Sequence, residues 1–329
     1  MHSVISEFDL IARYFKRPVP GTMLGAGDDC ALFGVPPGMQ VATSTDLLLE
    51  GRHFFSDVDP RTLGHKALAV NLSDLAAMGA TPIACLLGLG LPEIDETWLA
   101  SFAEGFYDLA QQHDCPLIGG DTTRSLHGIT ISVTVFGSVD PERTLRRSTA
   151  RPGDEIWVSG VLGAADIACR MLAGTLPADP LLLRQLRASL ETPSPRIALG
   201  LALTRHAHAA IDVSDGLLQD LSHILHASGC GAHIRQAALP WHPALAQRTA
   251  HALDDQVLRQ AMLAGGDLYE LCFTAPGKAH NAILQLAEKL DISLTAIGVI
   301  THAPGLVVYD LAGQAISDLP AGFDHFRIG

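Results

Sequence analysis

The sequence predicts two α/β domains: an N-terminal mixed sheet with helices over residues 1–145 and a C-terminal α+β domain over residues 146–329. Three observations lead to this fold class. A chain of 329 residues exceeds the size of one average domain, so two cores are expected. Strand and helix patterns alternate along the chain, without the regular βαβ spacing of a dinucleotide-binding fold. The polar run at 140–155, which contains two prolines, marks the boundary.

The first domain begins with an amphipathic segment, MHSVISEFDLIARYFKR, which predicts a helix and lacks the pattern of a secretory signal. The β-branched run 39–46 predicts a strand that delivers Asp46 at its C-terminal end. The further predicted elements are a helix over 60–78, a strand over 83–91, a helix over 96–114, a short strand over 115–121 that enters a glycine turn, and a strand over 128–139.

The second domain begins at EIWVSG. A proline-rich loop is predicted from GTLPADP to ETPSPR, and Ser214 or Asp215 is expected to cap the helix that follows AIDVSDG. The other predicted elements are helices over 163–173, 196–206 and 278–290, and strands in YELCFTAP and TAIGVITHAPGLVVYD.

Composition excludes several classes of protein. A net charge of −13 disfavours nucleic acid and anionic membranes as partners, because both reward basic patches. No apolar run is long enough to span a bilayer. The six cysteines are scattered without CxxC pairs, which argues against a disulfide framework or a zinc site and favours a reducing cytoplasm.

Acidic residues beside glycine or small hydroxyl residues are the main chemical signal. Asp74 lies in the apolar helical segment KALAVNLSDLAAMG, where an isolated carboxylate would be costly and is expected to be paired, hydrogen-bonded or bound to a metal. The other acidic positions of this kind are Asp28, Asp29, Asp46, Asp121, Asp212 and Asp215. Hard oxygen ligands suit magnesium, and magnesium suits substrate phosphates.

Six segments in this order, GAGDD, STD, NLSDLAAMGA, GGDTTR, RSTARPGD and AIDVSDGL, resemble the thiamine-monophosphate kinase family, of the superfamily that includes aminoimidazole ribonucleotide synthetase. The resemblance covers essentially the whole chain. It implies the two-domain fold of that superfamily, with the second domain completing the active site in the cleft between the two, and a homodimer formed through the first domain. It also implies transfer of the γ-phosphoryl group of ATP to thiamine monophosphate, assisted by several Mg²⁺ ions.

The resemblance further implies site residues at the matching positions. The expected metal ligands are Asp29, Ser44, Thr45, Asp46, Asp74, Asp121, Asp212 and Asp215. The expected ATP contacts are Gly120, Asp121, Arg147 and Ser214, and the expected substrate contacts are His53, Asp267 and Phe323. Arg147 and Asp212 are the expected catalytic residues, with Arg147 stabilising charge directly.

One motif departs from the family, which usually reads GGEDYEL where this chain reads GGDLYEL; the difference bears on thiamine recognition more than on phosphoryl transfer. Simpler roles are open for Asp28 as a turn residue, His53 as a surface residue and Phe323 as a core residue. Two other functions are also open: a sister ATP-dependent enzyme of the superfamily, or a non-catalytic nucleotide-binding homologue.

Overall fold

The computed structural model describes residues 7–246 and 253–323. The chain divides into two compact units. The first comprises the residues up to Leu75 together with Ala80–Glu142, and the second comprises Ala76–Gly79 together with the residues from Arg143 onward. Among the described helices, none is long and apolar enough to cross a membrane.

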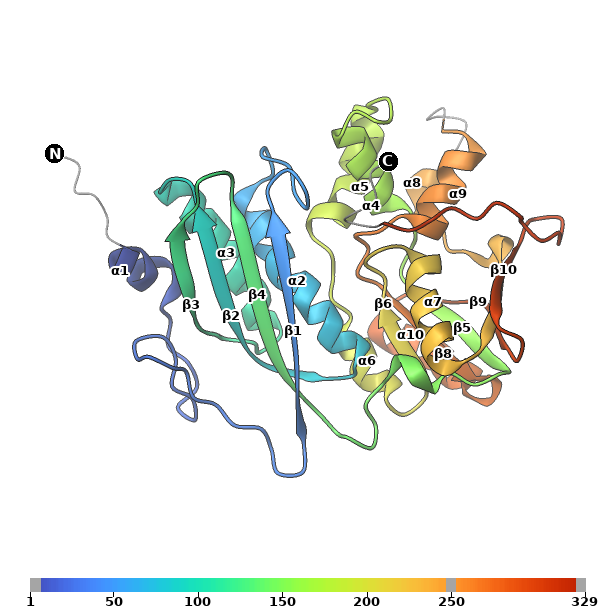
Figure 1. Ribbon diagram of the computed structural model, residues 1–329, viewed down its shortest axis with the longest axis horizontal. Helices are drawn as coiled ribbons and strands as arrows, with labels where there is room; N and C mark the ends of the chain where they lie inside the picture. Colours follow the sequence, from blue (N-terminus) through green and yellow to red (C-terminus); the bar gives the residue numbers. More distant parts are fainter. Residues whose placement is uncertain (1–6, 247–252, 324–329) are drawn as a thin grey trace. The chain divides into compact units, whose positions relative to one another are not determined.

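The first unit is a four-stranded mixed sheet with the strand order β1-β4-β2-β3, in which only β2 and β3 pair in parallel. Figure 1 shows its two long helices, α2 and α3, on the same face of this sheet. The elements are α1 (Glu7–Leu10), a π-helix η1 (Ile11–Phe15), β1 (Gln40–Leu49), α2 (Pro60–Ala77), β2 (Thr81–Leu91), α3 (Glu96–Gln112), β3 (Leu117–Arg124) and β4 (Thr130–Val139).

Two glycines let α2 and α3 approach closely. A Cβ atom on Gly64 would lie 2.0 Å from the carbonyl oxygen of Phe102, and one on Gly105 would lie 1.9 Å from that of Arg61. Asp95 caps α3, because its side chain accepts hydrogen bonds from two backbone N–H groups of the first turn. This packing fixes α2, the helix that carries Asp74.

The opposite face of the first sheet carries exposed apolar side chains. Val41, Leu47 and Leu49 alternate along the edge strand β1 and are 51%, 57% and 40% exposed. Because side chains at alternate positions of a strand share one face, these residues form an apolar stripe on the side away from the helices. We call these three residues the β1 stripe.

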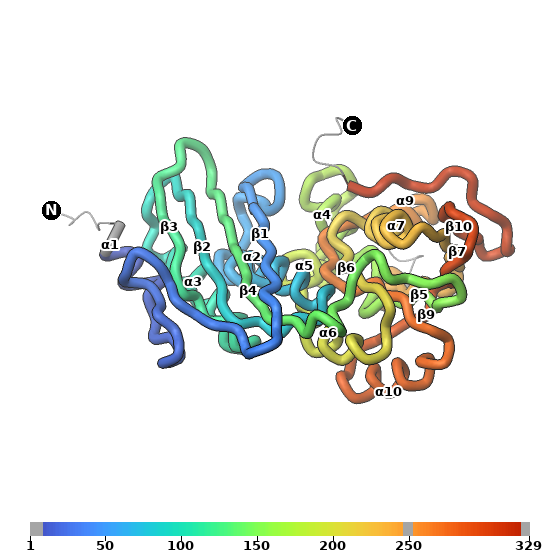
Figure 2. The backbone as a smooth tube through the Cα atoms, turned by 60° about the horizontal axis from the view of Figure 1, so that its bottom comes forward, coloured from blue at the N-terminus to red at the C-terminus, as the bar shows by residue number. Residues whose placement is uncertain are grey.

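The second unit is built on a six-stranded sheet with the order β10-β7-β9-β5-β8-β6, in which only β10 and β7 pair in parallel. Figure 2 shows helices α7 and α10 on opposite sides of this sheet. The strands are β5 (Asp154–Ser159), β6 (Ala209–Asp212), β7 (Gly231–Arg235), β8 (Leu271–Pro276), β9 (Leu294–Thr301) and β10 (Gly305–Tyr309). The helices are η2 (Arg147–Thr149), α4 (Ala164–Leu172), α5 (Pro180–Glu191), α6 (Ile197–Leu203), α7 (Leu217–Ser228), η3 (Gln236–Ala238), α8 (Pro243–Ala246), α9 (Asp255–Ala264), η5 (Gly277–Ala279) and α10 (His280–Leu290).

The prediction of mixed α/β architecture is confirmed, but three local predictions are wrong. Strand β1 continues through the apolar residues after Asp46, so Asp46 lies inside the strand rather than at its end. Strand β3 runs through Gly119 and Gly120 to Arg124, where a glycine turn was expected. Helix α5 occupies part of the predicted loop, because Asp179 caps it and Pro180 fits the first helical position. Strand β7 and helix α9 were not predicted from the sequence.

Candidate functional site

Asp74 faces strand β1. The hydroxyl of Ser44 donates a hydrogen bond to Asp74 Oδ2 at 2.5 Å. Asp46, two residues further along the same face of β1, lies close enough for the charge of Asp74 to affect it. Burial and then the charge of Asp74 raise the pKa of Asp46 from 3.8 to about 6. Asn71, one turn before Asp74, accepts a hydrogen bond from the Asp46 backbone N–H at 3.0 Å and holds the strand against the helix.

This cluster of Ser44, Asp46 and Asp74 fits a divalent cation. Two neighbouring carboxylates that disfavour each other's ionisation would both be stabilised in the charged form by a cation between them. Within the residues that the structure describes, no group of three or more His, Cys, Asp or Glu side chains is arranged to hold a metal ion. A two-carboxylate site matches magnesium, which keeps several waters and completes its shell with substrate phosphates.

Three further candidates of the first unit have other contacts. Thr45 lies on the opposite face of β1 and its hydroxyl bonds to that of Thr134 at 2.7 Å. Asp29 is exposed, and its backbone N–H donates to the side chain of Asp28 at 2.9 Å, which supports a turn role for Asp28. His53 accepts a hydrogen bond at Nδ1 from the Leu49 N–H at 3.0 Å, just past the end of β1.

Gly120 and Asp121 lie in β3, at the edge of the sheet opposite β1. Strands β4 and β2 intervene, so three strand spacings, about 14 Å, separate β3 from β1. Asp121 and Asp46 therefore lie on opposite edge strands of the sheet. Gly120 has a φ of 156°, and a Cβ atom there would lie 1.8 Å from the carbonyl oxygen of Leu87, so this position requires glycine.

In the second unit, the loop Asp212–Gly216 joins β6 to α7 and carries three candidate residues. Asp212 ends β6 and is buried. The predicted capping of α7 by Ser214 or Asp215 is wrong: the N-cap is Gly216, without a side-chain hydrogen bond. Instead, Asp220 Oδ2 accepts hydrogen bonds from the N–H groups of Ser214, Asp215 and Gly216 at 3.0, 3.0 and 3.2 Å.

The buried carboxylate of Asp220 was missed by sequence analysis. Its burial raises the pKa to about 7, although the three N–H groups act in the opposite direction. The only signal in the sequence was its place four residues after Gly216 in an otherwise apolar helical face. Asp220 thus binds the backbone of the loop, and the side chains of Ser214 and Asp215 remain partly exposed.

The two candidate substrate contacts of the second unit bond to this same loop. The N–H of Asp267 donates to the Ser214 carbonyl oxygen at 2.7 Å, and the N–H of Phe323 donates to the Asp215 carbonyl oxygen at 3.0 Å. Five candidates from three distant parts of the sequence are thereby gathered in one place: Asp212, Ser214, Asp215, Asp267 and Phe323. We call this group the loop cluster.

The motif GGDLYEL adopts a conformation that is rare for side-chain-bearing residues. Asp267 and Tyr269 have φ values of 64° and 56°, in the left-handed region that residues with side chains seldom adopt. Leu268 is only 7% exposed, which indicates a packing role for this departure from the family motif. Glu270 is held by Arg196 at 2.5 and 2.7 Å and by the Ser159 hydroxyl, and its carbonyl oxygen accepts from the Val213 N–H at 2.8 Å.

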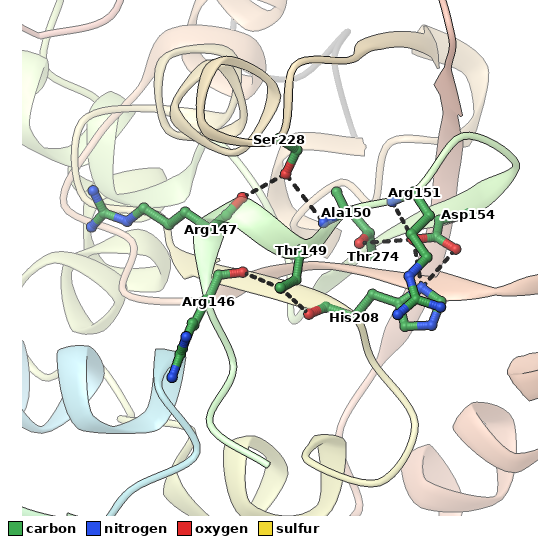
Figure 3. Close-up of polar contacts among 9 residues, drawn as sticks. All are labelled: Arg146, Arg147, Thr149, Ala150, Arg151, Asp154, His208, Ser228 and Thr274. Carbon is green, nitrogen blue, oxygen red and sulfur yellow. Dashed lines mark hydrogen bonds and ion pairs between the residues drawn. The ribbon is translucent and has the colours of Figure 1, made fainter. Parts of the chain in front are cut away.

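Arg147 lies on η2 in a segment whose backbone is firmly held (Figure 3). The Ser228 hydroxyl, at the end of α7, donates to the Arg147 carbonyl oxygen at 2.8 Å and accepts from the Ala150 N–H at 3.1 Å. The Thr149 hydroxyl, which has one proton to donate, lies 2.9 and 2.5 Å from the carbonyl oxygens of Arg146 and His208. Figure 3 shows both arginine side chains extending away from this network and from each other. The backbone of Arg147 is therefore fixed, while its guanidinium group lies away from the residues that fix it.

Asp154 anchors the other end of the same segment. Its buried carboxylate accepts hydrogen bonds from the Arg151 N–H at 2.9 Å and from the Thr274 hydroxyl at 3.3 Å. The Nδ1 atom of His208 lies 2.9 and 3.0 Å from the two carboxylate oxygens. The motif RSTARPGD is thus bonded to α7, to β8 and to the residue before β6, all of which belong to the second unit (Figure 3).

Comparisons with known proteins identify the family of this chain. Residues 27–139 match the N-terminal domain, and residues 151–310 the C-terminal domain, of the AIR synthase related proteins. The chain is 45% identical to "Thiamine-monophosphate kinase" of Escherichia coli strain K12, over 97% of this chain and 98% of that one.

Solved structures give the same result. The crystal structure of thiamine-monophosphate kinase from Stenotrophomonas maltophilia K279a superimposes with a TM-score of 0.82 at 45% identity, covering 93% of this chain and 95% of that one. "AaThiL complexed with AMPPCP and TMP" superimposes with a TM-score of 0.77 at 28% identity, covering 89% of each chain. The chain therefore belongs to the thiamine-monophosphate kinase family.

Proposed function

We propose that this protein transfers the γ-phosphoryl group of ATP to the phosphate of thiamine monophosphate, giving thiamine diphosphate and ADP. The observation that carries the proposal is the loop cluster, in which the expected contacts for metal and ATP share backbone hydrogen bonds with the expected contacts for the acceptor. The relative complexed with AMPPCP and TMP supports the same pair of ligands.

The acceptor explains why the site needs charge stabilisation more than a base. A phosphate monoester has a second pKa near 6, so it is already largely ionised at neutral pH. Two polyanions must then be brought together in line, and the charge of the transferring group must be stabilised. Arg147 is suited to this role, because its guanidinium stays protonated and extends from a fixed backbone.

The protein's own carboxylates would hold the metal. Ser44, Asp46 and Asp74 form the first candidate site, and Asp212 with Asp215 lies on the loop of the second unit. The resemblance also implies Asp29, Thr45 and Asp121 as ligands. Thr45 faces the opposite side of β1 from Asp46, so its side chain would not hold the same ion as Ser44, Asp46 and Asp74. Magnesium held there would supply positive charge that offsets the negative charge of the two phosphate-bearing substrates.

The acceptor would be held by His53, Asp267 and Phe323. The exposed ring of Phe323 is suited to stack on an aromatic ring of thiamine. The Asp267 side chain can accept a hydrogen bond, although it is one methylene shorter than the glutamate of the usual family motif. Gly120 and Ser214 would contact ATP, together with Asp121 and Arg147.

We further propose a homodimer that forms through the first sheet and works in the reducing cytoplasm. The β1 stripe is the surface that a second copy would cover, because exposed apolar side chains on an edge strand favour association. All six cysteines are free thiols, as that compartment requires. Leu47→Lys should yield monomers in size-exclusion chromatography with light scattering, whereas Leu311→Lys, a change of a leucine in the second unit that is even more exposed, should not.

The reaction is tested by incubating the protein with ATP, Mg²⁺ and either thiamine monophosphate or free thiamine, and separating the products by chromatography or phosphorus NMR. The proposal expects thiamine diphosphate and ADP from the monophosphate alone. Product from free thiamine would identify a different acceptor. Binding of Mg²⁺ and ATP without any product would instead favour a sister activity or a non-catalytic role.

A further inference from the structure

The C-terminal segment that ends with Phe323 is fastened to helix α7 by a residue outside the proposed ligand set. Gln219, in the first turn of α7, donates from Nε2 to the Phe323 carbonyl oxygen at 2.7 Å. The Phe323 N–H donates to the Asp215 carbonyl oxygen at 3.0 Å. Both backbone polar groups of Phe323 are therefore bonded to the stretch 215–219, which begins in the loop cluster.

The neighbouring glycine makes this close approach possible. A Cβ atom on Gly322 would lie 2.5 Å from Gln219 Oε1, 2.7 Å from Gln219 Cβ and 2.8 Å from the Asp215 carbonyl oxygen. Real Cβ atoms essentially never come so near to a backbone oxygen, so the segment can lie here only because residue 322 has no side chain. The contact between the segment and α7 is thus made by the backbone of one partner and a specific amide side chain of the other.

The Phe323 side chain behaves differently from its backbone. It is 42% exposed, although its N–H and carbonyl groups are both engaged. An exposed aromatic ring on a fixed backbone loses little conformational entropy when a flat ligand stacks on it. With its backbone fixed and its ring exposed, Phe323 is suited to contact the ring of a ligand. It lies beside the loop that carries the candidate ligands Ser214 and Asp215.

We propose that Gln219 is a positioning residue for the acceptor substrate, which acts by holding the Phe323 ring in place through the Phe323 carbonyl group. The inference rests on the proposed function, since the acceptor is taken to be the aromatic phosphate ester thiamine monophosphate. Gln219 touches neither the acceptor nor ATP in this scheme. Its loss should therefore weaken the acceptor's binding and leave the binding of ATP unchanged.

The test compares full-length variants in steady-state assays with thiamine monophosphate and ATP varied separately. Gln219→Met keeps the length of the side chain but cannot donate, and we expect the KM for thiamine monophosphate to rise about three- to tenfold, as for the loss of one hydrogen bond. The KM for ATP and kcat should stay within about twofold. His223→Ala, on the exposed face of the same helix, is the matched control and should leave all three constants unchanged.

A double-mutant cycle decides whether Gln219 acts through the ring. In a Phe323→Ala background, Gln219→Met should have no further effect on the KM for thiamine monophosphate. Gly322→Ala, which displaces the segment by steric contact, should reproduce the effect of Gln219→Met in a protein whose thermal unfolding is otherwise unchanged.

Three outcomes would overturn the inference: an equal rise of the KM for ATP, a fall in kcat alone, or an effect of Gln219→Met that persists in the Phe323→Ala background. These are distinct from failure of the proposed function itself. If the unmodified protein makes no thiamine diphosphate, the function falls and the inference falls with it. If the unmodified protein is active and the variants behave like it, only the inference falls.

Discussion

Removing Arg196 should destabilise the second unit strongly. Its guanidinium makes two hydrogen bonds to Glu270, at 2.5 and 2.7 Å, and the two side chains are only 22% and 12% exposed. Burial alone lowers the pKa of Arg196, but the hydrogen bond to Glu270 and the charge of Glu270 raise it by more, so the guanidinium stays protonated. Arg196→Met leaves the Glu270 carboxylate with the Ser159 hydroxyl alone, and we expect a loss of about 3 kcal/mol.

That loss corresponds to a fall in the melting temperature of about 6–12 °C for a unit of this size, measurable by differential scanning calorimetry. The companion variant Arg196→Met/Glu270→Leu removes both charges and should recover most of the stability, because a matched apolar pair needs no desolvation of ions. A single variant that loses less than about 1 kcal/mol, or a double variant less stable than the single, would refute the reasoning. Activity should fall with the single variant, since the Glu270 carbonyl group bonds to Val213 in the loop cluster's own segment.

Four further predictions address the site. Asp74→Asn should abolish turnover, because the negatively charged ligand of the metal is lost. The melting temperature should change little, because the amide oxygen can still accept the hydrogen bond from the Ser44 hydroxyl. Near-normal activity would show that Asp74 is not a metal ligand. Gly120→Ala should disrupt the pairing of β2 with β3 and weaken ATP binding measured by calorimetry, whereas Gly119→Ala, which meets only the end of a flexible leucine, should be tolerated. Ser228→Ala should lower kcat about three- to tenfold by freeing the backbone of Arg147, and Ser228→Thr, which keeps the hydroxyl, should restore it. Chelation by EDTA should stop turnover and added Mg²⁺ should restart it; activity that survives chelation would exclude a metal.

Fold class and family were accessible from the sequence because they depend on local patterns. The helix propensity of 60–78 and the apolar periodicity of 96–114 predicted α2 and α3 nearly to the residue. The order of six short acidic motifs predicted the family, which the comparisons confirm. A carboxylate in an apolar helix predicted that Asp74 needs a partner, and the structure places Ser44 and Asp46 opposite it.

The tertiary structure decided which candidates meet. Asp46 and Thr45 are adjacent in sequence but point to opposite faces of β1, because strand side chains alternate. Asp121 and Asp46 both follow small or hydroxyl residues in the sequence, yet they lie on strands at opposite edges of the sheet. Strand order is set by long-range pairing, which no local pattern encodes. The N-cap prediction for α7 failed because the helix begins only after Gly216, whose φ of 116° suits glycine, and the preceding loop is held by the carboxylate of Asp220 from within the helix.

The sequence by itself therefore determined the chemical groups that this protein carries: the carboxylates, the adjacent arginines at the start of the second domain and the glycines that let backbones approach. Only the tertiary structure decided that Asp267 and Phe323, far apart along the chain, bond to neighbouring carbonyl groups of one loop. Those hydrogen bonds depend on backbone atoms, which every residue has. Side-chain identity cannot reveal such contacts, and only the packed fold brings the atoms within reach.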